Sequence, residues 1–244
     1  MKEQKRIWEL DFIRGVAIIG MILTHINYDF LNYHNKSIFP PIASDVLGFL
    51  ILYGGALFLI ISGICCCLSK NNLKRGLTLF FVAMGVTYVT VIYQYMFSPE
   101  YTSTIFFGVL HCLSLCMVIS HFLMKIPQKK YITNPILFVL GILIIIAGIL
   151  LKDNDINLPI VCGNVIKPWF MTMDYFPLFP YLGWFIIGIV IGRIFYQKGR
   201  ALIKSEKIGN FFLIRAFSFV GRHSLIFYLA HQPIIFGIMM FINV

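Results

Sequence analysis

Long apolar runs separated by short polar segments dominate the pattern of this chain. A helix that crosses a bilayer needs about 20 mostly apolar residues, and this rule predicts about seven spans. Their expected ranges are roughly 12–31, 44–68, 76–97, 105–124, 134–151, 177–197 and 217–242. The pattern therefore predicts an all-α integral membrane protein, with one domain over residues 1–244 built as a helix bundle.

Composition supports a membrane location. The chain is 59% hydrophobic and 12% charged, with a mean hydropathy of +0.85. A soluble domain of this length has too much surface to carry so apolar a sequence. The first apolar run ends in Asn27, Tyr28 and Asp29 rather than at a small-residue cleavage site, so we interpret it as a retained span and not as a signal peptide.

Most of the Lys and Arg residues behind the net charge of +10 lie in the segments between the expected spans. If the N-terminus is cytoplasmic, most Lys and Arg residues fall in inner segments, and the outer segments hold only Lys36, Lys152 and Lys167. This asymmetry indicates a multi-pass cell-membrane protein, with the lipid bilayer and not nucleic acid as its partner. The cysteine spacing predicts neither a disulfide framework nor a metal site.

Ionisable residues inside the expected spans mark candidate chemistry, because they are costly in lipid. Asp11 and Arg14 are three residues apart and His25 and Asp29 four apart, so each pair shares a helical face. At about 1.5 Å per residue, His25 lies about 18 Å from the inner edge of the membrane. His111 and His231 lie at about 21 Å. We therefore expect the three histidines in one layer of the outer half, with Asp29 and Asp174 just above it.

A second layer of cations is expected at the inner edge. It consists of Arg14, Lys74, Arg75, Arg193 and Arg222. Arginines at span ends often only reach the lipid headgroups, which is the alternative for each of them. In the last expected span Ser224, Tyr228 and His231 are spaced by four and three, so they predict one polar stripe that leads from Arg222 to the histidines. We interpret His121 and His223, at inner helix ends, as structural.

Five stretches in order along the chain resemble a known family. They are Trp8–Gly15 with Asp11 and Arg14, Ile61–Gly63, Phe107–His111, Asp174–Gly183, and Gly221–Pro233 with Arg222, His223, Ser224, Tyr228 and His231. Together they resemble the heparan-α-glucosaminide N-acetyltransferase catalytic-domain family. The last stretch is also similar to the broader membrane acyltransferase superfamily.

The resemblance implies an enzyme that moves an acyl group, typically acetyl, from cytoplasmic acetyl-CoA to an amino sugar or other glycan beyond the membrane. It implies CoA phosphates at the inner cations, because Arg and Lys bind phosphate. The expected donor-binding residues are Arg14, Lys74, Arg75, Arg222, Ser224 and Tyr228. The expected catalytic residues are His25, Asp29, His111 and His231. The expected acceptor-binding residues are Asn27, Tyr28, His34, Asp174, Tyr175 and Gln232.

Two other classes stay open at this point. Histidines on separate helices at one depth also bind haem in redox proteins, and intramembrane ionisable residues also form the proton relay of a transporter. The sequence does not name the acceptor, the acyl length or the oligomeric state, for which a homodimer is one option.

Overall fold

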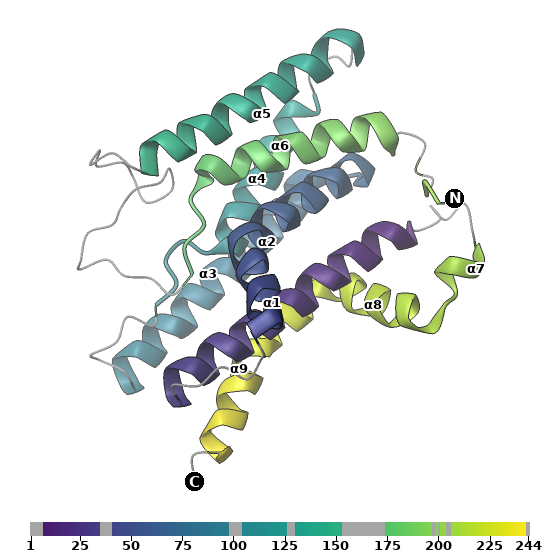
Figure 1. The fold of residues 1–244 in the computed structure, drawn as a ribbon. Coiled ribbons are helices and arrows are strands. Elements are labelled where there is room, and N and C mark those ends of the chain that lie inside the picture. Colours follow the sequence, from purple (N-terminus) through teal and green to yellow (C-terminus); the bar gives the residue numbers. More distant parts are fainter. Residues whose placement is uncertain are drawn as a thin grey trace. The chain divides into compact units, whose positions relative to one another are not determined.

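The computed structural model describes residues 7–34, 41–97, 104–125, 130–152, 174–196, 199, 201–203 and 206–242. These residues form helices, joined by loops and one isolated parallel β-bridge between Phe107 and Tyr175 (Figure 1). The helices are α1 (Trp8–His34), α2 (Pro41–Leu68), α3 (Asn72–Phe97), α4 (Val109–Leu123), α5 (Lys130–Lys152), α6 (Leu178–Phe195), α7 (Glu206–Gly209), α8 (Phe212–Arg222) and α9 (Ser224–Ile242).

Several helices have the length and apolarity that a bilayer requires. Within the described residues α3, α5 and α6 meet both conditions, and α8 with α9 provides a fourth if the two count as one span. Shorter apolar helices cover Tyr53–Leu68 and Val109–Leu123. The expectation of an all-α membrane protein is confirmed, while the count of seven spans and the cytoplasmic N-terminus stay predictions.

The last expected span, 217–242, is wrong as one continuous helix. The chain bends by 85° between α8 and α9, and His223 at the bend has non-helical dihedral angles, φ −107° and ψ 25°. Its amide N–H donates to the carbonyls of Phe219 and Val220, and its own carbonyl accepts from Ile226 and Phe227. His223 thus ends one helix and starts the next, a break that an uninterrupted apolar pattern does not reveal.

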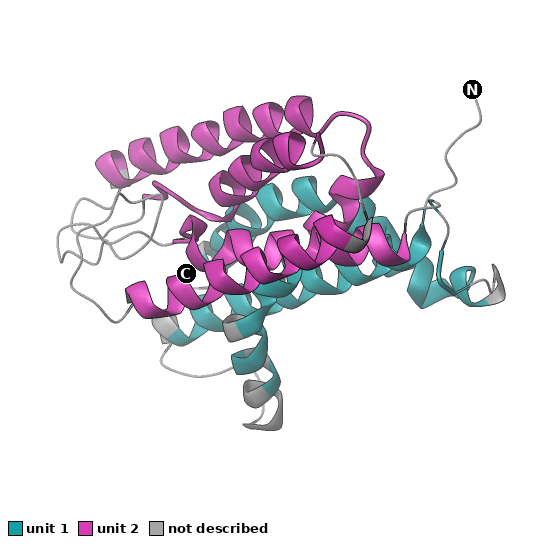
Figure 2. Cartoon of the chain, turned by 90° about the horizontal axis from the view of Figure 1, so that it is seen from above, with its two compact units in different colours: residues 1–61, 198–244 teal, residues 62–197 magenta. Residues whose placement is uncertain are grey.

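Two compact units make up the chain, and each is described here by itself (Figure 2). Unit 1 joins the two ends of the sequence, residues 1–61 and 198–244, and contains α1, the first part of α2, and α7 to α9. Unit 2 covers residues 62–197, with the end of α2 and helices α3 to α6. The single domain that the sequence predicts stays a prediction.

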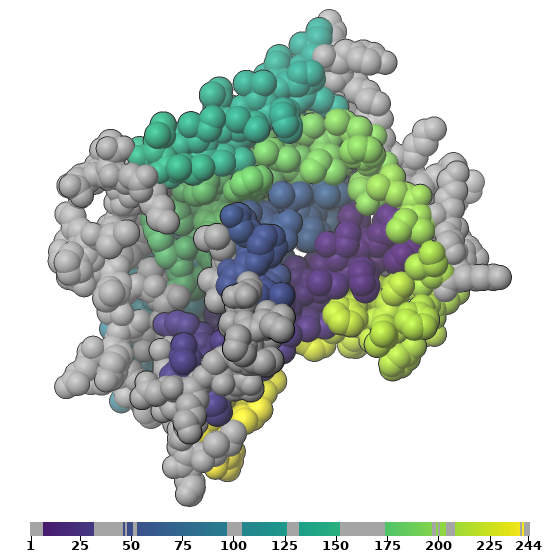
Figure 3. Space-filling model, viewed as in Figure 1, coloured from purple at the N-terminus to yellow at the C-terminus, as the bar shows by residue number. Residues whose placement is uncertain are grey.

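Unit 2 contains two tightly packed helix pairs, α3 with α4 and α5 with α6. Helices α5 and α6 lie against one another along their length (Figure 3). They run antiparallel, because Gly141 packs beside Gly183 whereas Gly148 packs beside Pro180. The face of α5 that includes Leu137 and Ile145 is buried, and apolar side chains cover its other faces as a lipid environment requires.

Unit 1 is held together by a very close crossing of α1 and α8 (Figure 1). A Cβ atom added to Gly15 would lie 1.9 Å from the Phe217 carbonyl oxygen, and one added to Gly221 would lie 1.8 Å from the Asp11 carbonyl oxygen. Backbone therefore touches backbone at this crossing, and only glycine fits at either position. Small residues allow the same close approach between helices in membranes generally.

We expect Gly221→Ala to destabilise the protein, because the new methyl group would force α1 and α8 apart. Overpacking of this kind costs about 1–3 kcal/mol of unfolding free energy, which should lower the midpoint of thermal unfolding. Gly237→Ala in α9 is the matched control, since a Cβ atom there would meet nothing within 4 Å. A Gly221→Ala midpoint equal to that of the control would contradict the crossing.

Candidate functional site

Two of the predicted histidines face each other in unit 1. The rings of His25 on α1 and His231 on α9 have centroids 5.0 Å apart and meet edge to face. Both side chains are partly buried. Because α9 follows the break at His223, the bend carries His231 to the side of α1 where His25 lies. The expected proximity of His25 and His231 is therefore confirmed, and their role in a common site stays a prediction.

Asp29 and Gln232 extend the same site. The Gln232 amide Nε2 donates to Asp29 Oδ2 at 2.9 Å, and the Asp29 side chain is 6% exposed. The sequence spacing predicts a pair between Asp29 and His25, and this is wrong for the described structure, where Gln232 is the hydrogen-bond donor to Asp29. The i, i+4 spacing puts two residues on one face, but a residue of another helix offers the better approach.

His231 has a fixed tautomer. Its Nδ1 lies against the Tyr228 carbonyl oxygen at 2.5 Å, and a carbonyl only accepts, so Nδ1 carries the hydrogen. Nε2 then presents a lone pair. This atom is buried and has no hydrogen-bond partner among the described residues, and the same holds for Gln232 Oε1 on the next residue. The site thus offers two buried acceptors on consecutive residues of α9, of which Gln232 is bonded to the Asp29 carboxylate.

The other predicted residues of these two helices differ in exposure. Ser224 and Tyr228 are half-buried on α9, and the Tyr228 ring lies 5.6 Å from that of His231. On α1, Asn27 is half-buried, whereas Tyr28 is 53% exposed. The side chain of His34 lies outside the described residues. The polar stripe of the sequence analysis is thus present on α9, but it does not continue along one helix from Arg222.

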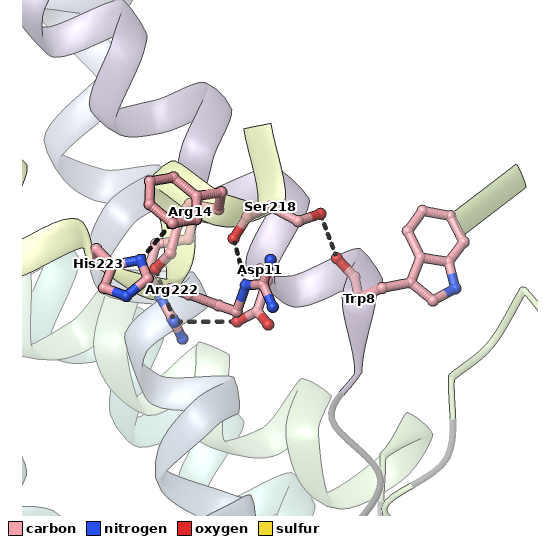
Figure 4. A network of polar contacts seen from close by, with 8 residues as sticks. Trp8, Asp11, Arg14, Ser218, Arg222 and His223 are labelled. Carbon is pink, nitrogen blue, oxygen red and sulfur yellow. Dashed lines mark hydrogen bonds and ion pairs between the residues drawn. The ribbon is translucent and has the colours of Figure 1, made fainter. Parts of the chain in front are cut away.

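The predicted pair of Asp11 and Arg14 is confirmed at the start of α1. Arg14 Nη1 lies 3.5 Å from Asp11 Oδ1, and it also donates to the Gly221 carbonyl at 3.3 Å (Figure 4). The Ser218 hydroxyl donates to the Trp8 carbonyl at 3.5 Å in the same network. A cation at the carbonyl end of a helix is favourable, so Arg14 binds the last turn of α8 to α1.

Arg222 is the more available cation at this end of unit 1. Its Nε donates to the Ser218 carbonyl at 3.3 Å, and the side chain is exposed. The two terminal nitrogens have no hydrogen-bond partner among the described residues, so they remain able to bind an anion. The neighbouring His223 donates through Nδ1 to the Phe219 carbonyl at 3.0 Å, in agreement with its structural interpretation.

His111 belongs to unit 2, so its place in a common layer with His25 and His231 stays a prediction. The side chain is 3% exposed, and both ring nitrogens are engaged. Nδ1 accepts from the Gly108 amide at 3.3 Å, and Nε2 therefore donates to Thr87 Oγ1 at 3.2 Å. The Thr87 hydroxyl in turn donates to the Ile105 carbonyl at 2.7 Å. These contacts favour a structural role over the predicted catalytic one.

Asp174 and Tyr175 bind the N-terminal end of α4. Asp174 Oδ2 accepts from the Val109 amide at 3.1 Å, and Tyr175 forms the β-bridge to Phe107. A Cβ atom on Gly108 would lie 2.3 Å from Asp174 Oδ2, so a larger residue there would displace this carboxylate. A carboxylate at a helix N-terminus is favourable. Both residues thus hold the start of α4, and their predicted contact with an acceptor stays a prediction.

The remaining predicted cations, Lys74 and Arg75, are exposed in the first turns of α3. Asn71 caps this helix, since its side-chain oxygen accepts from the Lys74 amide at 2.9 Å. No group of three or more metal-ligating side chains occurs within the described residues.

The sequence analysis missed the pairing of Gln232 with Asp29 and that of Thr87 with His111, because both join different helices.

Comparison with known proteins identifies the family of this chain. The family model described as "Heparan-alpha-glucosaminide N-acetyltransferase, catalytic" matches residues 6–233, nearly the whole chain and all five stretches singled out in the sequence. No curated protein and no solved structure matches. The chain therefore belongs to the heparan-alpha-glucosaminide N-acetyltransferase catalytic family, a family of multi-pass membrane acyltransferases.

Proposed function

We propose that this protein transfers an acetyl group from cytoplasmic acetyl-CoA to an amine or hydroxyl group of a glycan beyond the membrane. Family membership supports a membrane acetyltransferase. The observation that carries the proposal is that His231 Nε2 and Gln232 Oε1 are buried and have no hydrogen-bond partner within the described part of the chain. Two such acceptors suit a substrate group that brings its own hydrogens.

His231 is the general base in this proposal. A neutral imidazole whose other nitrogen is held by a backbone carbonyl is ready to take a proton at Nε2. As the acceptor nitrogen or oxygen bonds to the acetyl carbon, its proton passes to His231 Nε2. The carbon–sulfur bond then breaks and the proton moves to the sulfur, which releases CoA as the thiol. General-base assistance of this kind contributes roughly 10²–10⁴-fold.

His25, Asp29 and Gln232 support that step. The contact between the two rings places His25 beside His231, where a ring N–H of His25 can donate to the oxygen that becomes negative in the transition state. Asp29 orients the Gln232 amide through the 2.9 Å hydrogen bond, so Gln232 Oε1 is held as an acceptor for the attacking group. Asp29 thus acts as a positioning residue.

In this proposal Arg222 and Arg14 bind the phosphates of acetyl-CoA. Arg222 is exposed and its terminal nitrogens suit a bidentate phosphate contact. Arg14 contributes positive charge, although its hydrogen bonds to α8 already fix its position. Ser224 and Tyr228 follow on α9 toward His231 and would line the path of the pantetheine arm.

Replacing His231 with Ala should lower acetyl transfer by roughly 10²–10⁴-fold, because the base is lost, while CoA binding is retained. The measurement is single-turnover transfer from radiolabelled acetyl-CoA to glucosamine by the purified protein. Gly237→Ala on α9, where an added Cβ atom would meet nothing within 4 Å, is the control. His25→Ala should also slow transfer strongly. Normal turnover in the His231 variant would remove it from the mechanism.

Replacing Arg222 with Ala should weaken CoA binding by about tenfold, the effect of losing about 1.4 kcal/mol from a phosphate contact. The rate of transfer in the bound state should change far less. Titration calorimetry with CoA, together with kcat at saturating acetyl-CoA, separates the two quantities. Arg215→Ala, an exposed arginine on the same helix, controls for net charge. Equal CoA affinity in the Arg222 and Arg215 variants would contradict the assignment.

A further inference from the structure

One buried arginine of unit 2 has no role in the proposed reaction. Arg193 lies in the last turn of α6 and is 4% exposed. Its Nη2 donates to the Leu123 carbonyl at the end of α4, at 3.4 Å, and contacts Met124 Sδ at 3.5 Å. Nε and Nη1 are buried without a hydrogen-bond partner among the described residues. One N–H on Nε and two on Nη1 are therefore unused.

A buried cation is stable only when an anion or a full set of acceptors surrounds it. The carbonyl of Leu123 supplies one acceptor to Arg193. Asp174 is the one acidic residue among the described residues of unit 2. Its carboxylate binds the N-terminal end of α4 through the Val109 amide. Arg193 meets the C-terminal end, about 22 Å away along a 15-residue helix. The described part of unit 2 thus leaves this charge without a carboxylate.

Further positive charge gathers at the same end of unit 2. Gly76 packs against Ser114 and Val118, so the start of α3 lies along the last turns of α4. The exposed cations at these helix ends are Lys70, Lys74, Arg75 and Lys125. The end of α2 joins them, because Gly192 of α6 packs against Cys67 and the Asn72 amide donates to the Cys66 carbonyl at 2.9 Å. Like charges of this density favour an anionic ligand.

We propose that Arg193 is the buried anchor of a binding site for a phosphate ester, with the Met124 side chain as its cover. A guanidinium binds phosphate by several charge-assisted hydrogen bonds at once. The cover must move to admit a ligand, and the unbranched Met124 side chain adapts readily. The exposed lysines and Arg75 attract the anion, and Arg193 holds it at the junction of α4 and α6.

The phosphate ester can belong to CoA or to an anionic phospholipid at the membrane surface. If it belongs to CoA, the site rests on the proposed function. The full-length protein and its Arg193→Met variant would be placed in phosphatidylcholine nanodiscs and titrated with CoA. In parallel, native mass spectrometry would measure phosphatidylglycerol retained from mixed nanodiscs. Arg215→Met, which removes one exposed charge from α8 in unit 1, is the matched control.

The wild type and the control should bind CoA or retain phosphatidylglycerol, and Arg193→Met should lose at least tenfold in one of the two. Loss of CoA affinity assigns the phosphate to the donor, and loss of lipid retention assigns it to a headgroup. A wild type that retains lipid through Arg193 but binds no CoA would support this site and remove the proposed function.

Unchanged affinity for both ligands in Arg193→Met would overturn the proposal and leave Arg193 as a cap for α4. A wild type that binds neither ligand would overturn it as well. If Arg193→Met does not fold, Met124→Ala decides the question. Removal of the cover should then speed association of CoA or phosphatidylglycerol, and unchanged association rates for both would overturn the proposal.

Discussion

The backbone contact between α1 and α8 is the constraint on which the candidate active site depends. Gly15 and Gly221 let the first and last parts of the chain touch without intervening side chains, and Arg14 strengthens the contact by binding the Gly221 carbonyl. The chain then turns by 85° at His223, and α9 runs beside α1 in the same direction, with His231 next to His25 and Gln232 next to Asp29. Because the crossing fixes the start of α9 against α1, His231 lies at a defined position along α1, next to His25.

Four of the five sequence stretches that resemble the family meet in pairs. In unit 1 the stretch with Asp11, Arg14 and Gly15 packs against the stretch that begins at Gly221. In unit 2 the stretch that ends at His111 is fastened to the one that begins at Asp174, through the Val109 amide and the bridge to Tyr175. Much of each motif therefore builds the scaffold, and fewer residues remain for chemistry.

Hydrogen-bond saturation separates scaffold from chemistry among the histidines. His111 uses both ring nitrogens within unit 2, so it has no lone pair or N–H left for a substrate. His231 uses Nδ1, and its Nε2 finds no partner in the part of the chain that the structure describes. A buried polar atom without a partner is costly in the resting protein, and a substrate that supplies the missing hydrogen bond recovers that cost on binding. The same reasoning distinguishes Arg14, which is bound to α8, from Arg222 and Arg193.

The sequence by itself determined the membrane class, the position of most helices, the Asp11–Arg14 pair and the polar stripe on α9, because these follow from hydropathy and helical spacing along one segment. Only the tertiary structure decided that His223 breaks the last span, that Asp29 binds Gln232 rather than His25, and that His111 is saturated by Thr87 and Gly108. These facts depend on contacts between helices far apart in the chain. Helical periodicity gives the face on which a side chain lies, but the partner across that face is set by packing.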